Sequence, residues 1–457
     1  MLMPHSSIVH DLRSARSSGA LLTGAPLPTL LYFALPIILG NVFQQLYSIV
    51  DAIVVGNFLG DLSLSGISVA SPLVDVANAL VIGGTIGVGV LCAHYCGAGE
   101  EEHLRCMNAT ALLGGAVLTV LIAVCGIAFS APLLRAQGTE EAVCLEAAVY
   151  LRLVFAGLPF CFLYNYYAAM LRSCGDSRTP FFILLLASTL HALLDVLLTG
   201  VLAWGIRGVA VSTVLCQALS AAACILYAQR RCPPLFLRPA DLRFDRQMGR
   251  TALSYAWAAA LQQAVICIGR LLVQGMLTPL GTSTVTGYNM SLRTEQFLFC
   301  FSQGISAAMV VCLSQNLGHG DKLRARRFFR VSVLVELALI AVLGTVCFLF
   351  PARIVGLFSD NADVIAAGAR YTGTMAYLYV LAYLGEVIQG FFRGLGRLRL
   401  TMVASLLQVV LRVVLSYLLI PVWGMYGICA AVTAGWVLLA GLEGAYAVKK
   451  ARDLTAS

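Results

Sequence analysis

Three acidic side chains and one histidine stand inside long apolar stretches of this sequence: Asp51, His191, Asp195 and Glu386. An ionisable side chain at the centre of a bilayer costs at least about 2.5 kcal/mol, so it normally faces a cavity or a partner. Carboxylates held close together in a partly dry site can take up and release protons. These residues therefore predict a site that loads and unloads a proton or a cation.

His191 and Asp195 are four residues apart, which places both side chains on one face of a helix. Histidine titrates near neutral pH, whereas Na⁺ prefers oxygen ligands. The pair therefore favours H⁺ over Na⁺ as the ion that this site binds. A sodium site at Asp51 and Asp195 stays an alternative, as does a neutral His191 that only bonds to Asp195. A membrane-embedded acyltransferase is a remote alternative, because the spacing is one residue short of His-x₄-Asp and no nucleophile lies nearby.

The segments around these residues are long and apolar. Six lie at about 28–55, 64–96, 107–130, 146–170, 180–203 and 206–228, and six more at about 251–277, 284–316, 329–350, 365–392, 399–420 and 424–447. A membrane-spanning helix needs about 20 apolar residues. We therefore expect an all-α polytopic membrane protein with twelve transmembrane helices.

The composition supports this class. Of the 457 residues, 60% are hydrophobic and only 11% are charged, whereas a soluble domain carries about 25% charged residues. Mean hydropathy is +0.87. Continuous apolar runs exclude an outer-membrane barrel. The net charge of +8 does not indicate nucleic-acid binding, because the basic residues cluster in loops between apolar segments.

That clustering predicts the topology. Loops on one side carry most of the arginine and lysine, and those on the other hold only Arg135, Arg207 and Arg353. Since cytoplasmic loops are enriched in basic residues, we expect an inner-membrane protein with both termini in the cytoplasm. No cleavable signal peptide is expected in residues 1–26.

The two halves of the sequence repeat each other at an offset of about 221. Gly83 returns as Gly304, and Arg172 returns as Arg393. The repeat predicts two six-helix lobes related by a pseudo-twofold axis along the membrane normal, an arrangement typical of transporters with alternating access. The predicted parts are an N-terminal segment (1–27), an amino-terminal lobe (28–228), a basic linker (229–250), a carboxy-terminal lobe (251–447) and a tail (448–457).

Most of the fifteen cysteines lie in apolar runs, where they act as small hydrophobic residues. Cys92 and Cys96 are one helical turn apart, but no second pair accompanies them in the sequence. We therefore expect no metal site there and no cofactor.

Several motifs resemble the multidrug and toxic compound extrusion (MATE) family. They are Leu35-Pro36 followed by Gln44-Gln45 and Asp51, then Leu171-Arg172-Ser-Cys-Gly175-Asp176, and Gln315-Asn316-Leu-Gly318 before a basic run. Their order and spacing cover nearly the whole chain. The resemblance implies a monomeric antiporter that exports organic, cationic and amphipathic small molecules in exchange for H⁺ or Na⁺.

The resemblance also assigns roles to residues. Asp51 matches the cation-coupling aspartate and Asp195 the second aspartate of the amino-terminal lobe, where the family usually has asparagine in place of His191. Asn165 and Thr213 match polar positions that line the same site. Protonation is expected to bend the first helix around Pro36 and to close the cavity.

The substrate cavity is less well defined by the sequence. We assign Gln45, Gln263, Glu386, Tyr47 and Tyr288 to it, because aromatic rings can stack on a flat organic cation. Some family members carry a glutamate at the position of Gln263, so a second coupling site in the carboxy-terminal lobe is in doubt. Glu386 or Glu295 is expected to pair with Arg270. A lipid-linked oligosaccharide flippase is the nearest alternative function, but its cavity should be strongly basic.

Overall fold

The computed structural model describes residues 21–237 and 243–456. The predicted N-terminal segment lies mostly outside this part, as do the last residue and five residues of the basic linker. The described residues form helices and turns without any strand. Eleven helices are long and apolar enough to cross a membrane, or twelve spans when one bent pair counts as a single span. The predicted all-α polytopic fold is confirmed.

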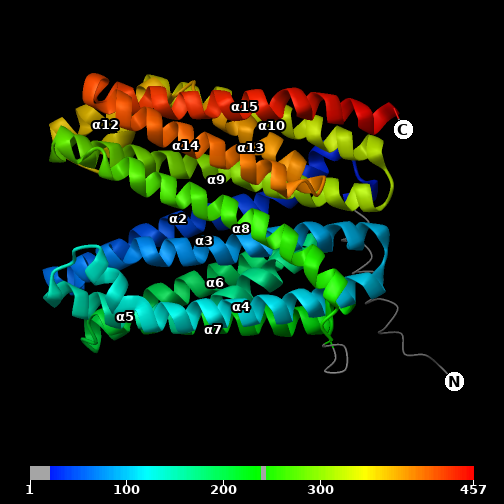
Figure 1. Ribbon diagram of the computed structural model, residues 1–457, viewed down its shortest axis with the longest axis horizontal. Helices are drawn as coiled ribbons and strands as arrows, with labels where there is room; N and C mark the ends of the chain where they lie inside the picture. Colours follow the sequence, from blue (N-terminus) through cyan, green and yellow to red (C-terminus); the bar gives the residue numbers. More distant parts are fainter. Residues whose placement is uncertain (1–20, 238–242, 457) are drawn as a thin grey trace. The chain divides into compact units, whose positions relative to one another are not determined.

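The first six spans follow each other through short turns (Figure 1). They are α2 (Pro26–Phe58), α3 (Asp61–Ala98), α4 (Glu101–Ala136), α5 (Glu141–Ser173), α6 (Arg178–Asp195) with the π-helix η1 (Val196–Val201), and α7 (Ile206–Arg231). A 3₁₀ turn, η2 (Pro233–Leu235), then begins the connection to the second half.

The second half adds one irregular span to the same plan. Its helices are α8 (Arg246–Gly275), α9 (Thr282–Gly318), α10 (Lys322–Leu349), α11 (Pro351–Gly356), α12 (Ala362–Met375), α13 (Tyr379–Gly394), α14 (Leu398–Trp423) and α15 (Met425–Ala456), with a 3₁₀ turn η4 (Thr278–Leu280) after α8. The sequence predicted one helix over 365–392. The structure instead has α12 and α13, bent by 58° at the break between them.

The chain divides into two compact units. Unit 1 contains Val42–Ala264, and unit 2 contains Gly24–Asn41 together with Val265 onwards. The division therefore falls within α2 and within α8, the first helix of each half.

In unit 1, glycines allow α3 to pack closely on α8. A Cβ atom on Gly83 would lie 2.6 Å from the Ala259 carbonyl oxygen, and one on Gly87 would lie 2.4 Å from the Tyr255 carbonyl oxygen. Small residues one turn apart let membrane helices approach until their backbones touch. These glycines therefore serve helix packing.

A polar network in unit 1 fixes α5 against α4. The Tyr166 hydroxyl donates to Asn108 Oδ1 at 2.7 Å, and Asn108 Nδ2 donates to the Leu235 carbonyl at 3.2 Å. Asn108 is fully buried and Tyr166 is 1% exposed. Buried polar groups need such partners because an unpaired one costs about 1–3 kcal/mol.

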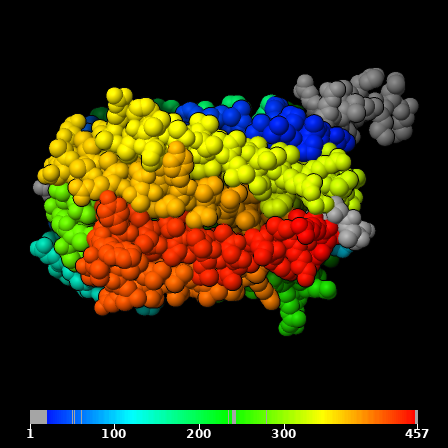
Figure 2. Space-filling view, turned by 90° about the horizontal axis from the view of Figure 1, so that it is seen from above, coloured from blue at the N-terminus to red at the C-terminus, as the bar shows by residue number. Residues whose placement is uncertain are grey.

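Unit 2 is built around tyrosines. The Tyr288 and Tyr371 rings pack edge to face with centroids 5.1 Å apart, and the Tyr383 hydroxyl donates to the Leu298 carbonyl at 2.6 Å. In Figure 2, α10, α13 and α15 form one continuous face of this unit. Leu334 and Val342 on α10 and Val437 on α15 are more than half exposed, which suits a surface that contacts lipid.

Candidate functional site

The predicted pair on α6 forms the centre of a buried polar site in unit 1. His191 Nδ1 lies 2.8 Å from Asp195 Oδ2, and His191 Nε2 lies 2.9 Å from Thr213 Oγ1 on α7. His191 is 6% exposed and Asp195 is fully buried. Partners on both ring nitrogens fix the orientation of the imidazole.

Helix α2 brings two further residues to the same place. Tyr47 and Asp51 are one turn apart, and the acidic oxygens of Asp51 and Asp195 and a ring nitrogen of His191 lie within 4.8 Å of one another. The Tyr47 hydroxyl hydrogen-bonds to His191 Nδ1, and the two rings meet edge to face with centroids 4.9 Å apart. Tyr47 was assigned to the substrate cavity, and the structure places it against the imidazole of His191.

Ser212 is a member of the site that the sequence did not indicate. It is fully buried on α7, and its hydroxyl donates to Asp195 Oδ1. Its neighbour Thr213 was predicted. A serine within a helix usually bonds only to a carbonyl one turn earlier, as Ser212 also does to Val209 at 2.9 Å. The contact with Asp195 depends on how α7 is rotated about its own axis beside α6, which the sequence does not show.

Asn165 on α5 makes its hydrogen bonds elsewhere. Its Nδ2 donates to the Cys161 carbonyl at 2.9 Å and contacts the Cys161 Sγ at 3.4 Å. The structure therefore does not join Asn165 to Asp51, His191 or Asp195 through a hydrogen bond.

The backbone changes type directly after Asp195. Helix α6 ends there and continues as the π-helix η1. A π-helical turn is rare and is found mostly at functional sites. Here it widens the helix immediately beside the buried carboxylate.

The residues assigned to the substrate cavity belong to both units: Tyr288 and Glu386 lie in unit 2, the others in unit 1. Gln45 on α2 and Gln263 on α8 are each half-buried. Tyr288 is 1% exposed within the core of unit 2, where Arg412 Nη2 donates to its hydroxyl at 3.4 Å. The ring of Tyr288 is thus enclosed by the core, and its assignment to the substrate cavity stays a prediction.

Glu386 has a different partner from the one predicted. It forms an ion pair with Arg393 on the same helix, and Arg393 Nη2 also lies 3.3 Å from Ser306 Oγ. The prediction that Arg270 pairs with Glu386 is wrong, and among the described residues Arg270 makes no ion pair within 4.0 Å. The Glu295 side chain accepts from the Tyr371 hydroxyl at 3.4 Å instead.

Replacing Glu386 by alanine is expected to destabilise the protein by about 1–3 kcal/mol, because the mostly enclosed Arg393 loses its ion-pair partner and keeps only the nearby Glu443. The side chain of Arg393 is only 11% exposed. The measurement is thermal unfolding in detergent, with the exposed Glu102→Ala on α4 as the control. Adding Arg393→Leu should restore most of the loss. Equal melting temperatures for Glu386→Ala and Glu102→Ala would show that the pair contributes nothing.

Comparison with known proteins gives one consistent result. The family model MatE matches residues 36–197 and 258–418. Among curated relatives, "Probable multidrug resistance protein YoeA" of Bacillus subtilis is 26% identical over 371 residues and 80% of each chain. "Probable multidrug resistance protein NorM" of Thermotoga maritima is 23% identical, covering 83% of this chain and 82% of its own.

A further relative, the "FAD transporter" of Shewanella oneidensis, is 27% identical and covers 74% of this chain and 75% of its own. Among solved structures, a MATE in complex with MaL6 superposes with a TM-score of 0.88 at 20% identity, over 96% of this chain and 99% of that one. An outward-facing multidrug resistance MATE transporter gives the same TM-score at 19% identity, over 96% and 98% of the two chains.

Proposed function

Because this chain belongs to the MatE family of multidrug efflux transporters, we propose that it is a proton-driven antiporter that exports organic, cationic and amphipathic compounds by alternating access. Membership of a transporter family leaves no place for the acyltransferase alternative. The flippase alternative would require a strongly basic cavity. In our proposal the protein is a monomer in the inner membrane with both termini in the cytoplasm.

The observation that carries this proposal is the hydrogen bonding of His191. The Thr213 hydroxyl lies 2.8 Å from the Val209 carbonyl and 2.9 Å from His191 Nε2, but it has only one proton to donate. If that proton points to Val209, Nε2 must donate to Thr213. The imidazole is then charged when Nδ1 also carries a proton, directed at Asp195 Oδ2 2.8 Å away, and neutral when Nδ1 accepts from the Tyr47 hydroxyl. If it points to His191, the imidazole is neutral. One rotation of a hydroxyl therefore accommodates both protonation states.

Protons fit this site better than Na⁺ does. A sodium ion needs several oxygen ligands, and here an imidazole nitrogen lies within 4.8 Å of both carboxylates. Asp195 already accepts from Ser212 and contacts His191. Asp51 Oδ1 is buried without a hydrogen-bond partner, so an added proton would give it a donor where it now lacks one.

In the proposed mechanism α2 carries the response. Pro36 lies within this continuous helix and cannot donate the usual backbone hydrogen bond, so the helix is weakest there. Proton loading would change how Asp51 and Tyr47 are held, and the helix would bend around Pro36. Pro36→Ala is expected to leave the protein folded and slow efflux severalfold. Unchanged efflux in that variant would remove the hinge from the mechanism.

The experiment for the proposed function uses purified protein in proteoliposomes. A proton gradient and a sodium gradient are imposed separately, and ethidium transport is followed by fluorescence. Transport is expected under the proton gradient and to fall at least about tenfold in His191→Asn, which keeps a polar side chain but removes the titrating ring. His103→Asn, an exposed histidine on α4, is the matched control.

Each other outcome has a clear meaning. Transport under the sodium gradient alone would overturn proton coupling. Transport of FAD but not of ethidium would overturn the cationic substrate class and agree with the relative that is a FAD transporter. Transport of neither by folded protein, with lipid-linked oligosaccharide translocated instead, would establish the flippase alternative.

A further inference from the structure

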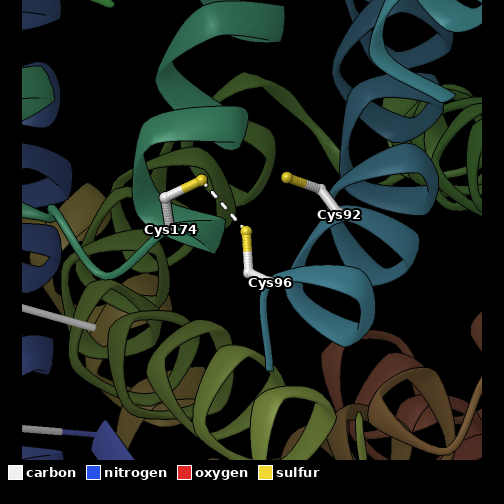
Figure 3. A group of neighbouring side chains, drawn as sticks. All are labelled: Cys92, Cys96 and Cys174. Atoms are coloured by element: carbon white, nitrogen blue, oxygen red, sulfur yellow. Dashed lines mark hydrogen bonds between the residues drawn. The ribbon is translucent and has the colours of Figure 1, made fainter. Parts of the chain in front are cut away.

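Three cysteines come together in unit 1 at the ends of α3 and α5. Cys92 and Cys96 are one turn apart on α3, and Cys174 immediately follows α5. Their Sγ atoms lie within 4.8 Å of one another, and Cys96 Sγ lies 3.1 Å from Cys174 Sγ. Figure 3 shows the three sulfur atoms directed toward one another. The sequence analysis considered only Cys92 and Cys96, because Cys174 is 78 residues beyond Cys96.

The backbone holds these thiols in place. The amide of Cys174 donates to the Met170 carbonyl at 3.0 Å, and Gly175 follows in the left-handed conformation with φ of 94°. The Ser173 hydroxyl donates to the Gly89 carbonyl at 2.8 Å, which ties the end of α5 to α3. Two of the sulfurs are therefore carried by α3, and the third by the turn directly after α5, which the Ser173 hydrogen bond ties to α3.

We propose that Cys92, Cys96 and Cys174 form a three-coordinate binding site for a thiophilic metal ion of the Cu(I) type. A metal–thiolate bond is about 2.3 Å long, so three sulfurs around one ion lie about 4 Å apart, within the spread seen here. On binding, the thiols release their protons to solvent and three metal–sulfur bonds form. No group changes its oxidation state.

The ligand set selects the kind of ion. Soft thiolate ligands favour Cu(I), whereas structural Zn²⁺ sites almost always have four ligands. Among the described residues, the group that could hold an ion here has three members, all of them cysteines. Cys92 is fully buried and Cys174 is 9% exposed, while Cys96 is half-buried and provides the route of entry.

The inference is independent of transport and is tested by metal binding alone. The full-length protein, purified anaerobically under reducing conditions, is titrated with Cu(I) in competition with a chromophoric Cu(I) chelator. One ion per chain is expected to bind with an affinity that falls at least tenfold in Cys96→Ser and in Cys174→Ser. Cys125→Ser, an exposed cysteine on α4, is the matched control and should bind as the wild type does.

X-ray absorption provides a readout that a purely structural role for these cysteines would not change. In the wild type it should show three sulfur ligands at about 2.3 Å from the ion. In Cys96→Ser it should show two. This variant is chosen because Cys96 is half-buried, so the protein should tolerate its replacement most easily. Equal affinities for Cys96→Ser and Cys125→Ser would overturn the proposal. So would thiol labelling that finds Cys96 and Cys174 joined as a disulfide in growing cells, because a disulfide cannot ligate the ion.

Discussion

Asp195→Asn is expected to reduce proton-driven efflux to the level of empty liposomes, at least a hundredfold below the wild type. Asparagine has nearly the same shape and can still bond to Ser212 and His191, but it cannot accept a proton. Asp195 is fully buried, its Oδ1 accepts from the Ser212 hydroxyl and its Oδ2 lies 2.8 Å from His191 Nδ1. The measurement is ethidium transport at saturating substrate under an imposed proton gradient.

The control for this variant is Asp360→Asn, an exposed aspartate in unit 2. Ethidium binding by Asp195→Asn, followed by fluorescence anisotropy in detergent, should stay within about threefold of the wild type, since the substitution keeps the shape of the side chain. Coupled efflux that survives both Asp195→Asn and Asp51→Asn would contradict the role given to this site.

The second large effect is expected from a change that adds one carbon atom. In Gly87→Ala the new Cβ would lie 2.4 Å from the Tyr255 carbonyl oxygen and 2.8 Å from the Ala256 amide nitrogen. Both atoms belong to the backbone of α8, so they cannot turn aside as a side chain would. Overpacking of this kind costs about 1–3 kcal/mol, and we expect the upper end of that range.

The sequence offers a matched control for Gly87→Ala three residues earlier. A Cβ on Gly84 has Ala256 Cβ as its nearest neighbour, at 4.0 Å, so Gly84→Ala should be tolerated. Thermal unfolding in detergent and the yield of monodisperse protein measure the difference. If both alanine variants melt at the wild-type temperature, α3 and α8 do not touch as closely as described.

Local features of the functional site could be predicted from the sequence. The four-residue spacing of His191 and Asp195 fixes their proximity within a single helix, and the structure shows them in contact. The Glu386–Arg393 pair was also local, since seven residues make two helical turns. It was missed because the predicted segment at about 365–392 ends just before Arg393, whereas the structure has this arginine in the last turn of α13.

Features that depend on how helices pack could not be predicted. Whether Ser212 or Thr213 faces Asp195 depends on the rotation of α7, and whether Cys174 meets Cys96 depends on the height of α5 beside α3. The break between α12 and α13 also lacks a local signal, because Ala376, Tyr377 and Leu378 are neither proline nor glycine. These features follow from contacts between distant segments, which one sequence does not record.

The π-helix after Asp195 also has a consequence for how this helix tolerates changes in length. Each residue of an α-helix turns it by about 100°, so one inserted residue would normally rotate everything beyond it out of phase. Here both ends are tied to α7: Asp195 accepts from the Ser212 hydroxyl on that helix, and the chain enters α7 at Ile206. The wider turn at Val196–Val201 takes up the extra residue between them. Deletion of one residue here would convert the π-helical turn into an α-helical turn. The residues on either side would keep their positions, so this segment can change length by one residue without rotating the rest of the helix.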